Sequence, residues 1–143
     1  MKYPMLALLA GLAFAPAVLA AEADQEAAAG VTTETLLATT KTWDGTPYTA
    51  YAKGQPELTV LKITIPAHTK LAWHEHPMPS AAYILSGDLT ILTYGGKTHV
   101  VHAGQAVAEV VNKVHRGITG AKPVVLLAFY AGTKGTPVSI PWP

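Results

Sequence analysis

The chain of 143 residues is long enough for one domain of ordinary size and leaves little room for a second. Hydrophobic residues make up 50% and charged residues only 13%, which permits a packed core and argues against disorder of the whole chain. The formal net charge is +1 and no cluster of basic residues exists, so we expect no nucleic-acid partner.

Residues 1–20 have the pattern of a secretory signal peptide. Lys2 supplies a short positive region, Met5–Phe14 an apolar region, and Val18–Ala20 a small-residue cleavage site. A membrane anchor is the alternative, but the apolar run ends at Pro16 and is shorter than the ~20 residues that a span needs. We therefore predict a periplasmic or secreted protein that is cleaved near the end of this segment.

Cleavage would remove one basic residue, Lys2, and leave nine basic and nine acidic residues. The mature chain is then formally neutral, so we expect no binding to membranes after cleavage. The chain has no cysteine, so any metal would be held by histidine, carboxylate or water, and stability would rest on the core or on that metal. Residues 21–33 are small and polar and predict a flexible leader, with the domain in residues 34–143.

The first part of that domain gives weak structural signals. Glu34–Thr42 is compatible with a short helix or an opening strand, and its threonines favour the strand. Trp43–Gly45 is typical of a turn, and Tyr48–Tyr51 is predicted to be extended.

From Pro56 onward the pattern is that of β-strands. Apolar and polar residues alternate towards the end of Leu58–Ile65, as in a strand with one buried face. Val124–Tyr130 is apolar throughout, which predicts a strand buried on both faces. The tail, Gly132–Pro143, contains three prolines and is predicted to be loop or edge. Other strands are predicted at Ala81–Leu85, Leu89–Tyr94, Lys97–His102, Gln105–Val111 and His115–Thr119.

Eight or nine short strands with no convincing long helix indicate an all-β fold. The regular spacing of strands and turn residues favours an antiparallel sandwich or a small antiparallel barrel, the jelly roll included.

The strongest candidate for chemistry is His74-Glu75-His76. Alternate side chains of a strand share one face and lie about 6–7 Å apart, so the two histidines point the same way. That spacing suits two nitrogens that bind one metal ion at about 2 Å each. Two histidines spaced in this way occur by chance in many chains, but a third, His115, follows at a suitable distance.

These histidines and two turn glycines resemble the paired motifs of single-domain cupins. The first motif is matched by His74, His76 and the segment Tyr83–Gly87, and the second by Gly104 and His115. The resemblance extends over roughly residues 58–130. It implies a jelly-roll barrel in which the two motifs together hold a metal ion.

The chain also departs from the family pattern. Ser80 stands where the first motif has a metal-binding glutamate, and the second motif lacks its usual proline, glycine and asparagine. Glu75 points away from its neighbouring histidines, and Met78 is a soft ligand that would suit copper(I). Glu109 precedes His115 by six residues. Its side chain could face the solvent or turn inward. We predict that it turns inward as a ligand or a hydrogen-bond partner, and that the metal site comprises His74, His76, His115 and Glu109.

Other aromatic and histidine residues give weaker signals. The three remaining histidines are predicted to lie at the surface, and four aromatic residues near the motifs are predicted to pack in the core. The histidines are His68, His99 and His102, and the aromatic residues are Trp73, Tyr83, Phe129 and Tyr130.

The predicted cofactor is a divalent transition metal, with Mn, Fe, Cu, Ni and Zn not distinguished. Three functions are compatible with such a site: metal binding without a known reaction, metal-dependent oxygenase, isomerase or lyase activity on a small anionic substrate, and copper buffering. A metal-free cupin that binds a small ligand is a further alternative. No residue stands out as a nucleophile, so the sequence leaves catalysis open. It also leaves open a small-molecule ligand and a homodimer.

Overall fold

The computed structural model describes residues 30–143. Within this range, Glu34–Pro143 form one compact unit that contains every described strand. The predicted signal peptide and most of the predicted leader lie outside the described residues.

Residues 30–143 contain nine β-strands and no helix. Accordingly, nothing in this part of the chain is a helix long and apolar enough to cross a membrane. The strands are β1 (Pro56–Ile65), β2 (His74–Glu75), β3 (Ser80–Ser86), β4 (Asp88–Thr93), β5 (Thr98–His102), β6 (Ala106–Ala108), β7 (His115–Thr119), β8 (Val124–Thr133) and β9 (Ile140–Pro141).

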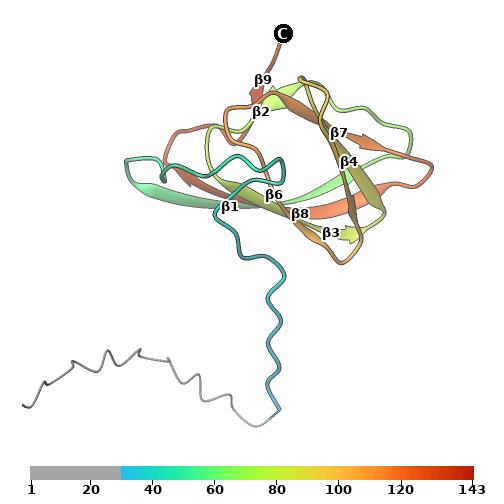
Figure 1. Ribbon diagram of the computed structural model, residues 1–143, viewed down its shortest axis with the longest axis horizontal. Helices are drawn as coiled ribbons and strands as arrows, with labels where there is room; N and C mark the ends of the chain where they lie inside the picture. Colours follow the sequence, from blue (N-terminus) through green and yellow to red (C-terminus); the bar gives the residue numbers. More distant parts are fainter. Residues whose placement is uncertain (1–29) are drawn as a thin grey trace, which may run out of the picture. The chain divides into compact units, whose positions relative to one another are not determined.

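The strands form two antiparallel sheets, with the orders β1-β8-β3-β6 and β5-β4-β7-β2-β9. Figure 1 shows β1 and β8 along one side of the domain and β2, β9 and β7 along the other. Strands that follow one another in sequence frequently belong to different sheets, so the chain winds between them. The predicted small antiparallel jelly roll is therefore confirmed.

The core lies between the two sheets, because buried residues alternate along the strands of both. On β3 and β8 the buried side chains face the same side, since Ala82 pairs with Ala128 and Ile84 with Leu126. From the second sheet, β4 and β5 contribute the buried residues Leu89, Ile91 and Val101.

The junction of β3 and β4 requires glycine. Gly87 has a φ of +80°, which residues with a side chain rarely adopt. A Cβ atom at this position would also overlap the carbonyl oxygen of Pro123. The turn glycine of the first motif therefore has a steric role in the fold.

The prediction that Val124–Tyr130 is buried on both faces is wrong. Val124, Leu126 and Tyr130 are buried, but Phe129 on the opposite face is 44% exposed. The reason is that this sheet has a second layer on only one side, so the outer face of β8 is only partly covered.

Two further expectations need correction. Glu34–Thr42 is neither helix nor strand, because this segment has only the isolated bridge between Lys41 and Pro47. The predicted strand Gln105–Val111 is reduced to three residues, since the chain leaves the ladder after β6. The turn at Trp43–Gly45 is confirmed.

Candidate metal centre

Three histidines from the two predicted motifs lie together between the sheets. His74 on β2 is the register partner of His115 on β7, and His76 follows directly after β2. One ring nitrogen of each residue lies within 4.8 Å of the others. The distances between ring centroids are 4.6 Å for His74 and His115 and 5.0 Å for the other two pairs.

Each of these histidines is oriented by a backbone carbonyl. Because a carbonyl oxygen can only accept a hydrogen bond, the Nδ1 atom of each ring must carry the proton and donate it. In the neutral ring this leaves Nε2 with a free lone pair, which is the form that binds metals. The acceptors for His74, His76 and His115 are the carbonyls of Ala72 at 2.9 Å, Val138 at 2.6 Å and Lys113 at 2.8 Å, respectively.

Burial keeps two of the rings uncharged. The exposed fraction is 5% for His76 and 3% for His115. Mainly because of this burial, the pKa of each imidazole is lowered to about 4. Both rings are therefore neutral at pH 7, as metal ligation requires.

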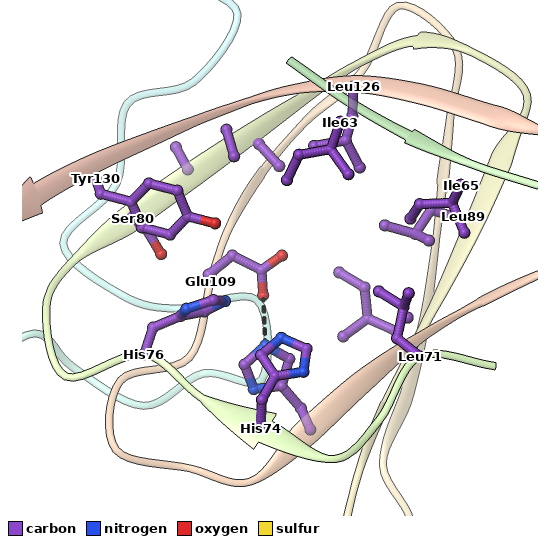
Figure 2. Close-up of a pocket in the computed structure, with 16 residues that line it drawn as sticks. Ile63, Ile65, Leu71, His74, His76, Ser80, Leu89, Glu109, Leu126 and Tyr130 are labelled. Atoms are coloured by element: carbon purple, nitrogen blue, oxygen red, sulfur yellow. Dashed lines mark ion pairs between the residues drawn. The ribbon is translucent and has the colours of Figure 1, made fainter. Parts of the chain in front are cut away.

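Glu109 faces the same pocket, as Figure 2 shows. It follows β6 and shares a face with Val107, a core residue opposite Ala82, so strand alternation turns its side chain inward. Its Oε2 atom lies 3.7 Å from Nε2 of His115. The group of side chains whose ligand atoms all lie within 4.8 Å of one another contains the three histidines but not Glu109. The role of Glu109 as a fourth ligand therefore stays a prediction.

The carboxyl group of Glu109 is in an unusual environment. Its Oε2 atom is buried and has no hydrogen-bond partner among the described residues. Burial raises the pKa of this carboxyl group to about 7. Ser80, which replaces the family's usual glutamate, also has a buried Oγ without a partner and lines the same pocket.

These features fit a divalent transition metal. Three imidazoles each bring a ring nitrogen within 4.8 Å of the others, and two unpartnered oxygen atoms lie in the same pocket. Nitrogen and oxygen donors of this kind suit Mn, Fe, Ni, Cu and Zn. Unpartnered buried polar atoms are rare, and a bound ion with its water ligands would satisfy them.

Tyr130 packs in the core as the sequence predicted, and it also belongs to this site. Its ring lies 5.3 Å from that of His76 and lines the pocket. Burial, with a contribution from Glu109, raises the pKa of its hydroxyl group. The position of Tyr130 in β8 was the signal in the sequence for this role. Alternate side chains of a strand share a face, so Tyr130 lies on the buried face with Ala128.

Other candidates lie elsewhere. Met78 is fully buried in the core, where it packs against Gly132, and neither it nor Glu75 lines the pocket. Trp73 packs against Tyr94 and Arg116. The remaining histidines are exposed as predicted, namely His68, His99 and His102.

The segment before β1 braces the loop that carries Glu109. The hydroxyl group of Tyr48 donates a hydrogen bond of 2.9 Å to the carbonyl oxygen of Glu109. The ammonium group of Lys113 forms an ion pair with the carboxylate of Asp44. Because the carbonyl of Lys113 orients His115, this ion pair helps to hold a residue that positions the site.

Comparison with known proteins agrees with this geometry. The family model for the cupin domain matches residues 61–130, a range that contains the three histidines and Glu109. No match is found among the curated proteins.

Similar solved structures have the same fold. The DMSP lyase DddQ from Ruegeria pomeroyi DSS-3 is 22% identical, with a TM-score of 0.52 over 67% of this chain and 46% of that one. A cupin-like protein from Thermotoga maritima is 16% identical, with a TM-score of 0.54 over 59% of this chain and 64% of that one. The chain thus spans less than half the length of the lyase, and identities this low indicate a shared fold alone.

Proposed function

This chain belongs to the family of cupin domains, and on that premise we propose that it binds one divalent transition metal through His74, His76 and His115. The observation that carries the proposal is the orientation of the three rings. Each Nδ1 is engaged by a backbone carbonyl, which leaves three Nε2 lone pairs for one ion.

Glu109 and Ser80 have supporting roles in this proposal. The carboxylate of Glu109 acts as a fourth ligand or accepts a hydrogen bond from a water molecule on the metal. The hydroxyl group of Ser80 holds a second water molecule or a ligand, which satisfies its buried oxygen atom. The bound ion would supply Lewis acidity towards an oxygen atom of a ligand.

An enzyme that acts on a small anionic substrate is the second candidate function. The cavity beside the histidines favours it, because a site that only stores metal needs no such space. The similarity to a DMSP lyase is compatible with it but concerns the fold alone. Copper buffering has less support, since the thioether of Met78 is buried elsewhere in the core.

We further propose that the protein is exported, on the evidence of residues 1–20. The mass of the protein recovered from the periplasm or the medium tests this proposal. A mass that corresponds to a chain beginning near Ala21 would support cleavage. A chain that retains Met1 in the membrane fraction would contradict it.

The metal content of the purified protein tests the main proposal. The protein is stripped with a chelator, dialysed against Zn²⁺ or Co²⁺, and measured by mass spectrometry of the metal together with protein quantification. We expect one equivalent of metal per chain. A protein that binds no divalent metal above background would overturn the proposal.

A further inference from the structure

The pocket of the three histidines has two chemically different ends (Figure 2). At one end lie the histidines with Glu109, Ser80 and Tyr130, and the other end is formed by aliphatic side chains. Figure 2 shows this separation clearly, with the aliphatic residues grouped on the side away from His76. These residues are Ile63, Ile65, Leu71, Leu89 and Leu126.

The pocket has no positively charged side chain at its aliphatic end. Among the described residues that line it, none is lysine or arginine. The guanidinium group of Arg116, which is close in sequence to His115, lies over the ring of Trp73 instead. A negative charge at the aliphatic end would therefore be buried without a partner, which is strongly unfavourable.

The space available is small. The cavity volume is about 80 Å³. That is roughly half of the 150 Å³ that accommodates benzene in an engineered apolar cavity, and the volume includes the end lined by the histidines, so only a small ligand fits. Bulky rings and long chains are excluded on this ground.

We propose that this site selects a short monoanionic oxygen ligand with an aliphatic remainder, such as a short-chain carboxylate or an enolate of similar size. The inference rests on the proposed metal site, because the anionic head would lie at the metal. The remainder then packs against Ile63, Leu71 and Leu126, where apolar contacts stabilise it and a second charge does not fit.

Butyrate and succinate test this selection, because they have four carbons each and differ in whether the chain ends in a methyl or a carboxylate group. The protein is first loaded with Co²⁺, and its metal content is measured. Each acid is then titrated while the visible spectrum of the cobalt is recorded. We expect butyrate to bind at least ten-fold more tightly than succinate.

A charge introduced at the aliphatic end should reverse this preference. Leu71 and Ile63 are partly buried, so a longer side chain can be placed at either position. In Leu71→Lys we expect succinate to bind more tightly than butyrate, whereas the uncharged control Leu71→Gln should not prefer succinate. Ile63→Lys serves as the second variant if Leu71→Lys does not fold.

A further titration separates carboxylates from enolates as the head group, using acetylacetone in place of butyrate. Binding of either monoanion supports the proposed class. Cobalt-loaded protein that binds succinate as tightly as butyrate, or that binds none of these compounds, would overturn the inference and leave metal binding intact. Protein that takes up no cobalt would instead overturn the proposed function.

Discussion

His74 and His115 are register partners on two adjacent antiparallel strands, and their ring centroids are 4.6 Å apart. β2 is only two residues long, yet it lies between β7 and β9 and is held on both sides. This pairing brings together two motifs that are separated by about forty residues in the sequence. The position of the candidate metal centre is thus determined by the backbone pairing of the second sheet.

Loss of one histidine should remove most of the metal. We expect His74→Ala, His76→Ala and His115→Ala each to lower the affinity by at least about 100-fold, because two imidazoles alone make a weak site. His102→Ala is the control, since His102 is exposed and pairs with Asp88. Metal analysis and competition with a chelating dye measure the effect. Full occupancy in all three site variants would show that the metal binds elsewhere.

Glu109→Gln should weaken metal binding without unfolding the domain. Glutamine is similar in size but lacks the negative charge, so we expect affinity to fall by about 10–100-fold. Glu75→Gln is the matched control, because Glu75 does not line the pocket. The visible spectrum of the cobalt-loaded protein reports a change of ligand or of bound water. An unchanged affinity and an unchanged spectrum would contradict a role for Glu109 at the metal.

The ion pair of Asp44 should make the domain sensitive to acid. Burial would raise the pKa of this carboxyl group, but hydrogen bonds from Lys113, Thr42 and Thr46 outweigh it and hold the pKa well below its usual range. A pKa that is lowered by folding gives stability that is present above the unfolded-state pKa of about 4 and is lost as the pH falls further.

Asp44→Asn should therefore lower the free energy of unfolding at pH 7 by about 1–3 kcal/mol and flatten its decline below pH 4. Asp88→Asn is the control, because the side chain of Asp88 is 63% exposed and its pair with His102 contributes little. Urea unfolding at a series of pH values measures both effects. An equally steep acid decline in Asp44→Asn would refute this assignment.

Substitution of Gly87 should be more harmful than substitution of Gly96. Both have a positive φ, +80° and +87°, which costs a residue with a side chain about 1–2 kcal/mol. Only at Gly87 would the added Cβ meet neighbouring atoms, those of Pro123 and Val124. We expect Gly87→Ala to destabilise the domain by about 1–3 kcal/mol more than Gly96→Ala in thermal unfolding. Equal losses would indicate that the backbone angle alone matters.

Much of the fold followed from local patterns in the sequence. Strand β7 has the predicted bounds, β5 differs from them by one residue at one end, and β3 and β4 differ by one residue at each end. Alternation grouped Glu109 with Val107 but left open which face of the strand points inward, and the structure decided this in favour of the face with Glu109. Predictions were wrong where tertiary contacts decide, as at the outer face of β8 and in Glu34–Thr42, because burial and strand pairing depend on a second layer or a partner strand.

The sequence by itself determined the all-β class and the shared face of His74 and His76, because these depend on a period of two and on turn residues. The choice of the jelly roll and the candidacy of His115 came from the resemblance to the paired cupin motifs. Only the tertiary structure decided which groups surround the histidines. Val138 orients His76 across 62 positions, and Asp44 pairs with Lys113 across 69. Such contacts depend on how distant strands are placed in space, and no local pattern of residues encodes them.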